Sequence, residues 1–350
     1  MNRSSRYSAR SPREKLRFAI VGAGAVTQSY LEAFEHCPEA RVVAVADCRL
    51  EAAQRVAERM NCRCYDCADV MIRDGGLDAA IVCTPPVTHP DICLRLMQSK
   101  INVLCEKPFT ITSCDAQRML DTAARMGVKL TMASKYRYVD DIIRAKSMIT
   151  SGLLGDLVLF ENNFSQRVAM GSRWNARPEI SGGGVLIDNG AHSVDLMHYF
   201  LGNLAEVRAT EGIRCQGLAV EDTVLLFARS VSGVLCNVSL SWSIAARGDN
   251  FLDIYGTRGA VSVGWKQSAR LDFAHQGWEP FGEGYNKIRA FRKQIENFSR
   301  AIRGEEALLI SAEDAVASVK IIECARQSLH QNQWIPVSAP IATDSRKDVH

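Results

Sequence analysis

The sequence contains no long apolar run and no marked excess of either charge. No stretch reaches the roughly 18 apolar residues of a membrane span, and the first residues lack the apolar core of a signal peptide. We therefore expect a cytoplasmic protein that binds no membrane. Lys and Arg number 42 against 39 Asp and Glu, a net charge of +3, so electrostatics give no case for nucleic acid as the main partner. Internal repeats and low-complexity segments are absent as well.

The one local excess of charge is basic and lies at the start of the chain. Residues 1–15 carry five basic side chains among Ser and Asn, before the first apolar run: Arg3, Arg6, Arg10, Arg13 and Lys15. We interpret residues 1–15 as a flexible, solvated tail, with a role in adhesion or targeting as the alternative.

Twelve cysteines are scattered through apparent strands and helices. In a large chain without a signal peptide this distribution favours buried free thiols over a disulfide framework. One cluster, Cys62, Cys64 and Cys67, has the spacing C-x-C-x-x-C and could supply thiolates to zinc. Zinc sites usually pair two such clusters, and no fourth ligand is evident nearby. We therefore predict no metal.

The first part of the chain has the pattern of βαβ units. Between Leu16 and Ser134 short apolar runs alternate with amphipathic stretches, which predicts an α/β fold with an N-terminal Rossmann domain, a doubly wound parallel sheet, over residues 16–135. Thr88 and Asp91 predict an N-cap with a capping box, and Gly127 predicts the end of a helix. The expected strands are Arg17–Val21, Arg41–Ala46, a weak one near Cys64, Ala79–Cys83, Asn102–Cys105 and Lys129–Ala133.

The pattern changes after residue 135 and predicts a C-terminal α+β domain over residues 136–340. Between Val234 and Trp242 apolar and polar residues alternate strictly, which indicates a strand with one buried face. We expect it to pair with Thr223–Arg229 in a mainly antiparallel, open sheet. Because an open sheet needs cover for whatever its own helices leave exposed, we also expect a homodimer or homotetramer through this domain.

A dinucleotide site is predicted where the first strand turns into a helix. Gly22 permits the tight turn, and Gly24 lets the backbone approach a pyrophosphate at the helix N-terminus. Asp47 follows the second strand, where a carboxylate binds the adenosine ribose diol and repels a 2′-phosphate. NAD is therefore expected rather than NADP, although Arg49 could soften this preference. Thr27 stands where the fingerprint has Gly or Ala.

Three further motifs follow this glycine loop in order. They are Cys83-Thr84-Pro85-Pro86 with His89, then Glu106-Lys107-Pro108, then the run from Ser181 to Leu196 that contains Asp188, His192 and Asp195. Together the four motifs resemble the glucose–fructose oxidoreductase, inositol dehydrogenase and MocA family over residues 16–265. The resemblance implies that Lys107, Asp188 and His192 form the catalytic group. The further residues assigned to the cofactor are Ala25, Val26, Thr84, Pro85, His89, Glu106 and Lys107.

The residue types suit a dehydrogenase, which needs a base for the hydroxyl proton while hydride leaves carbon. Asp188, His192 and Asp195 are spaced to share one face of a helix. His192 can take the proton, and Asp188 can orient it or hold the substrate. Lys107 ends a strand at the ligand-binding edge and can stabilise the developing alkoxide. We interpret Asp195 as structural, and His89 as either a cofactor neighbour or a packing residue.

Three other residues are candidate substrate contacts besides Asp188 and His192. Arg173 and Trp174 occupy a long loop and could hold a sugar face, or else anchor an interface. Lys135 stands where the resembled family usually has an amide. Its cation could bind an acidic group on the substrate or make Lys107 easier to deprotonate.

The leading hypothesis is an NAD-dependent dehydrogenase for a secondary hydroxyl of a sugar, an inositol or a similar cyclic polyol. The resemblance also allows an NAD-dependent glycosidase that uses transient oxidation. A catalytically silent, cofactor-binding regulator is the third possibility. Lys107, Asp188 and His192 argue against the regulator, because a sensor needs only the dinucleotide site.

Overall fold

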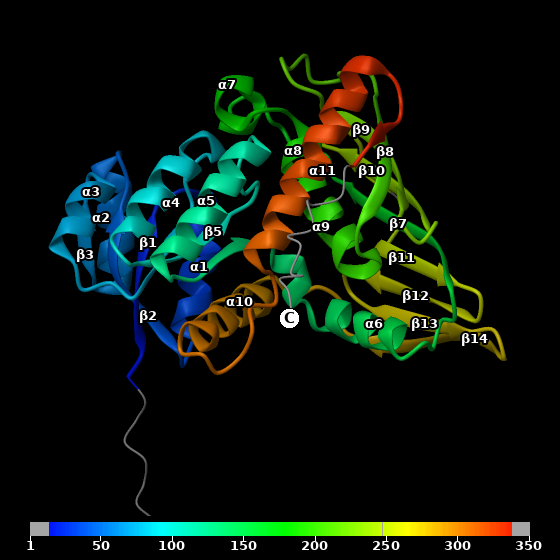
Figure 1. Cartoon of the computed structure of the whole chain (residues 1–350), viewed down its shortest axis with the longest axis horizontal. Helices are drawn as coiled ribbons and strands as arrows, with labels where there is room; N and C mark the ends of the chain where they lie inside the picture. The colour runs from blue at the N-terminus through cyan, green and yellow to red at the C-terminus, as the bar shows by residue number, and fades with distance from the viewer. Residues whose placement is uncertain (1–13, 247, 338–350) are drawn as a thin grey trace, which may run out of the picture.

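The computed structural model describes residues 14–246 and 248–337. They form two α/β units side by side, one around a six-stranded sheet and one around a nine-stranded sheet (Figure 1). Most of the expected basic tail lies outside the described residues. Lys15, at its end, donates a hydrogen bond to the Cys37 carbonyl over 2.8 Å. In the described part of the chain no helix is both long and apolar enough to cross a membrane.

The N-terminal sheet confirms the Rossmann prediction. Its strands pair in parallel in the order β3-β2-β1-β4-β5-β6. The order reverses between β1 and β4, and ligands of doubly wound sheets bind at that point, outside the carboxyl ends of the strands. The bounds are β1 (Leu16–Val21), β2 (Ala40–Ala46), β3 (Arg63–Tyr65), β4 (Ala79–Val82), β5 (Asn102–Glu106) and β6 (Leu130–Ala133).

Helices connect these strands in the expected alternation. They are α1 (Ala25–Glu35), α2 (Leu50–Met60), α3 (Ala68–Asp74), α4 (His89–Gln98) and α5 (Ser113–Met126). Gly127 ends α5 in the left-handed conformation, as predicted. The predicted capping box at Thr88 is wrong, because this hydroxyl donates to the Pro85 carbonyl and to Thr84 and does not cap α4. The hydroxyl instead closes the 3₁₀ turn Pro86–Thr88 that precedes α4, through its bond to the Pro85 carbonyl.

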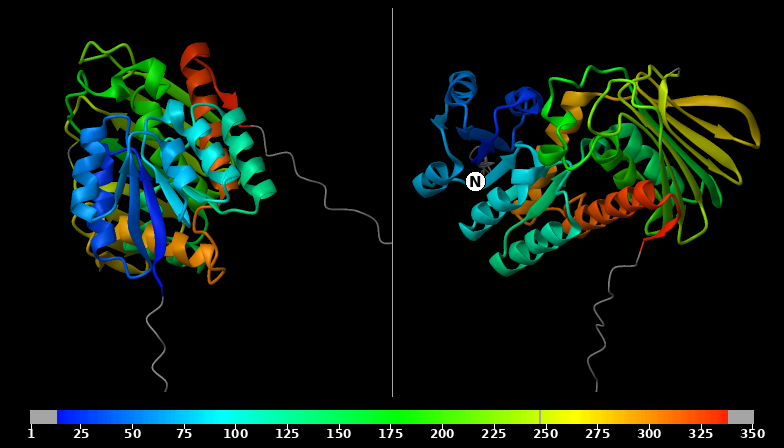
Figure 2. Two further views of the ribbon diagram at one scale, coloured as in Figure 1. Left: turned by 90° about the vertical axis from the view of Figure 1, so that its left-hand side faces the viewer. Right: turned by 90° about the horizontal axis from the view of Figure 1, so that it is seen from above.

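Helix α10 (Lys287–Ile302) joins the N-terminal unit although it comes from late in the chain (Figure 2). Its Phe298 packs edge to face on Phe18 of β1, with ring centroids 6.1 Å apart, and its Phe291 packs on Tyr30 of α1 at 4.6 Å. The predicted boundary at residue 135 lies where the chain leaves the first sheet. It does not separate the two hydrophobic cores by sequence, because the core of the first unit also includes α10.

The second sheet confirms the mainly antiparallel prediction. Its order is β14-β13-β12-β11-β7-β10-β9-β8-β15, and the β7–β10 pair is parallel whereas the other pairs are antiparallel. The bounds are β7 (Leu157–Ser165), β8 (Leu204–Glu211), β9 (Thr223–Ser230), β10 (Leu235–Ser241), β11 (Asn250–Gly256), β12 (Gly259–Gly264), β13 (Ser268–Asp272), β14 (His275–Gly282) and β15 (Ile335–Pro336). The expected strand is β10, and its inward residues are buried in alternation.

Helices cover one face of this sheet, between it and the first unit (Figure 2). They are α6 (Asp140–Thr150), α9 (Gly190–Leu201) and α11 (Ala312–Gln331). The opposite face carries apolar side chains that are between about one third and one half exposed in the described chain: Leu225, Phe227 and Leu235. This is the kind of uncovered face that the alternating pattern predicts.

Candidate active site

The glycine loop forms one wall of a cleft of about 810 Å³ at the carboxyl ends of β1, β2 and β4. Gly22 has φ +98°, and a Cβ there would lie 2.8 Å from the Cys83 carbonyl carbon, so a side chain is excluded. Gly24 caps α1, no side chain caps this helix end, and a Cβ on Gly24 would meet open space. Uncapped N–H groups facing a cleft suit a pyrophosphate.

Asp47 and Thr27 hold this loop in place. Asp47 accepts hydrogen bonds from the N–H of Ala23 (2.6 Å) and of Arg49 (2.8 Å). Burial opposes ionisation of Asp47, but these hydrogen bonds outweigh it and lower the pKa of the carboxyl below its usual value. Thr27, where the fingerprint has Gly or Ala, is fully buried and donates to the Gly22 carbonyl over 2.7 Å. The unusual residue thus fastens α1 to the turn.

The cleft brings together most of the predicted cofactor residues and the two loop residues. Gly22, Gly24, Ala25, Asp47, Thr84 and Pro85 all line it, and so do Arg173 and Trp174. The long loop therefore brings Arg173 and Trp174 to the dinucleotide end of the site. Val26, next to Ala25, packs partly buried against the core of the first unit.

Lys107 and Asp188 form the centre of the predicted catalytic group. Lys107 follows β5, and Asp188 ends the short helix α8 (Val185–Asp188). The Lys107 Nζ lies 2.5 Å from Asp188 Oδ1, and both side chains are about one fifth exposed. The predicted single helix through Asp188 and His192 is interrupted at Asn189, where α8 ends and α9 begins. Asp188 pairs with Lys107 instead of orienting His192.

His192 lies on α9, 6% exposed, among aromatic rings. Its imidazole meets Tyr136 edge to face at 4.8 Å and Phe164 at 6.2 Å. Among the described residues its Nδ1 has no hydrogen-bond partner, which leaves a buried polar atom free for a ligand. Burial first, then the charges of Lys107 and Lys135, place the pKa of His192 well below its usual value. The imidazole is therefore neutral around pH 7.

Lys135 starts the 3₁₀ turn Lys135–Tyr138 that follows β6, beside Lys107 at the same sheet edge. Its Nζ lies over three rings, 5.3 Å from the centroid of Tyr136 and 5.8 Å from those of Tyr285 and Phe291. Tyr136 therefore contacts both Lys135 and His192. Aromatic residues at this position were not predicted from the sequence, because their spacing is typical of ordinary core.

Two predicted cofactor residues are fully engaged with protein. His89 is fully buried, and its ring nitrogens lie within hydrogen-bond distance of the carbonyls of Thr84 (2.8 Å) and Pro108 (3.1 Å). His89 therefore links the loops that follow β4 and β5, which is the role of a packing residue. Glu106 accepts from the Tyr30 hydroxyl (2.8 Å) and from the N–H of Lys107 (3.0 Å). Burial raises the pKa of Glu106, although Lys107 opposes this.

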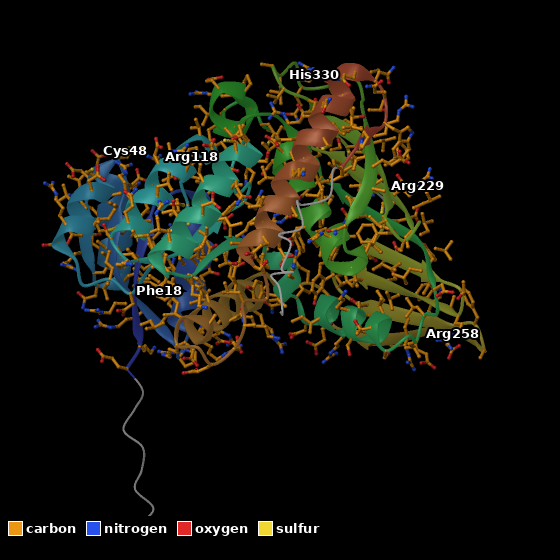
Figure 3. All side chains as sticks on the ribbon, viewed as in Figure 1. Phe18, Cys48, Arg118, Arg229, Arg258 and His330 are labelled. Atoms are coloured by element: carbon orange, nitrogen blue, oxygen red, sulfur yellow. The ribbon has the colours of Figure 1, made fainter. Side chains whose placement is uncertain are left out.

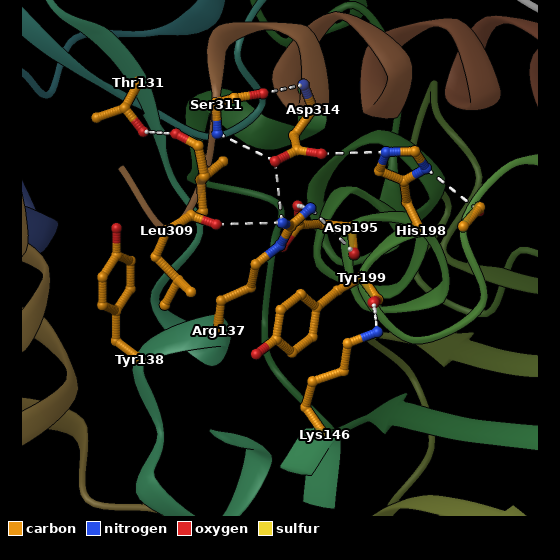
Figure 4. Close-up of polar contacts among 12 residues, drawn as sticks. Thr131, Arg137, Tyr138, Lys146, Asp195, His198, Tyr199, Leu309, Ser311 and Asp314 are labelled. Carbon is orange, nitrogen blue, oxygen red and sulfur yellow. Dashed lines mark hydrogen bonds and ion pairs between the residues drawn. The ribbon is translucent and has the colours of Figure 1, made fainter. Parts of the chain in front are cut away.

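A buried ion network anchors α9 behind the site (Figure 4). Arg137 pairs with Asp195 through two contacts of 2.7 and 3.0 Å, and reaches Asp314 of α11 at 3.2 Å. Asp314 also pairs with His198 and caps α11 through Ser311. Burial disfavours the Asp314 carboxylate, but His198, Arg137 and the Ser311 N–H lower its pKa to about 2. Asp195 is thus structural, as predicted, while Arg137 was not singled out in the sequence.

The cysteines only partly match the expected buried thiols. Five are buried, and five others are exposed, including Cys48 at the outer part of the first unit (Figure 3). Cys64 and Cys67 are exposed, while burial raises the pKa of Cys62 to about 11. Within residues 14–246 and 248–337, no group of three or more His, Cys, Asp or Glu side chains could hold a metal.

Comparisons with known proteins account for both units. Residues 16–134 match an oxidoreductase family with an NAD-binding Rossmann fold, and residues 142–262 match the GFO/IDH/MocA C-terminal domain. The chain belongs to the GFO/IDH/MocA oxidoreductase family. Strands β7 to β11 of the nine-stranded sheet therefore lie in the C-terminal domain of this family, and the glycine loop beside the cleft lies in its NAD-binding domain.

Individual relatives span nearly the whole chain. The rhizopine catabolism protein MocA of Rhizobium meliloti is 27% identical over 329 residues, covering 91% of this chain and 96% of that protein. Inositol 2-dehydrogenase of Rhizobium meliloti (strain 1021) is 24% identical over 343 residues, covering 92% and 99%. A levoglucosan dehydrogenase, solved with NADH and levoglucosan, superposes with a TM-score of 0.86 at 19% identity over 93% of this chain and 100% of that one, which shows a common fold.

Proposed function

We propose that this GFO/IDH/MocA protein is an NAD-dependent dehydrogenase that acts on a secondary hydroxyl of a sugar, an inositol or a similar cyclic polyol. The observation that carries the proposal is the Lys107–Asp188 pair at 2.5 Å, at the sheet edge next to the dinucleotide cleft. Relatives that span the chain support the substrate class, because one is named inositol 2-dehydrogenase and another was solved with levoglucosan.

The cofactor would lie along the cleft, with its pyrophosphate on the N–H groups around Gly24 and its ribose diol on Asp47. When bound, its nicotinamide accepts or donates the hydride. Gly24 leaves the approach to the helix end open, and Asp47 is held in the ionised form that a diol requires. We propose NAD rather than NADP, because the Asp47 carboxylate would repel a 2′-phosphate.

Lys107 and His192 have different roles in the proposed reaction. Asp188 holds the Lys107 ammonium in place, so that its remaining N–H groups can donate to the reacting oxygen and stabilise the alkoxide. His192, neutral because of its lowered pKa, accepts the hydroxyl proton during oxidation and returns it during reduction. The exposed fraction of Lys107 and Asp188, about one fifth each, leaves room for a substrate to reach both.

The test separates chemistry from cofactor binding. Lys107→Met and His192→Ala remove the proposed groups but leave Gly22, Gly24 and Asp47 intact. General acid–base catalysis is worth ~10²- to 10⁴-fold, so His192→Ala should lower kcat by at least about a hundredfold while NADH affinity, measured by fluorescence titration, is unchanged. If both variants bind NADH normally and keep more than about a third of wild-type kcat, the assignment is wrong.

We also propose that the uncovered face of the nine-stranded sheet pairs with a second copy to give a homodimer or homotetramer. Its exposed Leu225, Phe227 and Leu235 support this, because burial of such a patch contributes about 25 cal/mol per Å². An isologous contact across a two-fold axis would cover the same face on both copies.

A further inference from the structure

The ammonium of Lys135 lies in the active site without an acceptor. In the described part of the chain its Nζ makes no hydrogen bond and no ion pair, and its close contacts are the faces of Tyr136, Tyr285 and Phe291. Aromatic faces attract a cation but satisfy none of its three N–H donors. Lys107 and Lys146 provide a contrast, because Lys107 donates to Asp188 and Lys146 donates to the Tyr199 carbonyl.

The nearby carboxylates do not neutralise Lys135. Glu106 and Asp188 influence it electrostatically, but the two oxygens of Glu106 accept from Tyr30 and from the Lys107 N–H, and Asp188 is paired with Lys107. Lys107 and Lys287 add further positive charge around it. Burial first, then Lys107, lower the pKa of Lys135 to about 8, so the charged form still predominates at pH 7.

Lys135 is also accessible from the reacting groups. β5 and β6 are in register with Glu106 opposite Ala133, so Lys107 and Lys135 leave the sheet side by side at its carboxyl edge. Tyr136 contacts Lys135 on one side and His192 on another. The side chain is partly exposed rather than enclosed. A substrate held between Lys107 and His192 would therefore present a substituent to Lys135.

We propose that Lys135 binds a carboxylate of the substrate, so that the enzyme acts on a sugar acid or another polyhydroxy acid in preference to a neutral polyol. This rests on the proposed dehydrogenase function. A partly buried cation that has no acceptor loses part of its hydration, and an incoming anion would offset that cost. A single ammonium on an aromatic wall matches one negative charge, whereas phosphate sites ordinarily recruit arginine or several backbone N–H groups.

The first test measures binding without turnover. Calorimetric titration of the NADH-loaded protein would compare glucose, glucuronate and glucose 6-phosphate, and also galactose with galacturonate. We expect the acids to bind more tightly than the neutral sugars, and Lys135→Met to weaken only the acids, by about 10- to 100-fold, the range of a hydrogen bond to a charged group. Lys146→Met is the matched control, because it removes another lysine packed on a ring, away from the site.

Each outcome decides a separate question. The proposal is overturned if the acids bind no better than the neutral sugars, or if Lys135→Met does not weaken the binding of the acids. Preferential binding of glucose 6-phosphate would overturn it in favour of a phosphate site. Lys135→Arg keeps the charge and should therefore retain a preference for acids. This variant shows whether weaker acid binding in Lys135→Met comes from the lost charge or from a disturbed fold. Charge-selective binding without NADH formation from NAD would instead refute the dehydrogenase function and leave the anion site standing.

Discussion

The buried pair of Arg137 and Asp195 gives the most direct test of how α9, the helix that carries His192, is held. Asp195→Asn removes one charge while nearly preserving shape. The Asp195 and Arg137 side chains are 0% and 3% exposed, so the remaining guanidinium cannot recover water. Breaking a buried pair costs about 3–5 kcal/mol. Because Arg137 keeps Asp314 at 3.2 Å and the Leu309 carbonyl at 3.4 Å, we expect the lower end, about 3 kcal/mol.

Urea unfolding followed by far-UV circular dichroism would measure this loss as a lower midpoint at an unchanged slope. Glu279→Gln is the matched control, since it breaks the exposed pair with Arg270, and exposed pairs contribute at most about 1 kcal/mol. His192 lies one turn before Asp195 on α9, so kcat should fall as well, while NADH affinity stays close to that of the wild type. A loss of stability under about 1 kcal/mol, equal to the control, would refute the anchoring role.

Three further predictions concern the cofactor and the assembly. Gly22→Ala should lower NADH affinity at least about tenfold in fluorescence titration, because its Cβ would lie 2.8 Å from the Cys83 carbonyl carbon; unchanged affinity would contradict the tight turn. kcat/KM should favour NAD over NADP, and Arg49→Ala should widen the difference, whereas a tenfold preference for NADP would overturn the assignment to Asp47. Light scattering at micromolar concentration should give a dimer or tetramer, and Leu225→Lys should dissociate it.

The sequence predicts those parts of the molecule that depend on local chemistry. Gly22 and Gly127 have the positive φ that their positions suggested, and the alternating residues of β10 bury one face because side chains in a strand alternate. Lys107 and Asp188 are 81 residues apart. Their approach could be anticipated only through family resemblance, because no local pattern encodes a contact between two units.

Contacts between segments far apart in the chain account for what the sequence did not predict. Thr88 has the pattern of a cap, but its hydroxyl donates to the Pro85 carbonyl and does not cap the helix. Tyr136 and Arg137 follow a core strand and are ordinary residue types there, yet one contacts His192 and the other pairs with Asp195. Their roles arise from α9, which packs against them only in the folded chain.

Lys107 and Lys135, which we propose bind the alkoxide and the carboxylate of the substrate, also oppose proton acceptance by His192. A proton on this imidazole would add a third positive charge beside Lys107 and Lys135, which together with burial explains its lowered pKa. A substrate carboxylate on Lys135 would offset one of these charges and raise the pKa of His192 in the complex.

For oxidation the base must be neutral, so activity falls as the pH drops below the pKa of His192. The acid limb of kcat, which reports the complex, should therefore lie at higher pH than that of kcat/KM, which reports the free enzyme. Steady-state pH profiles of kcat and kcat/KM with glucuronate would measure both limbs, and Lys135→Met should bring them together. Coincident limbs in the wild type would show that the anion does not act on His192.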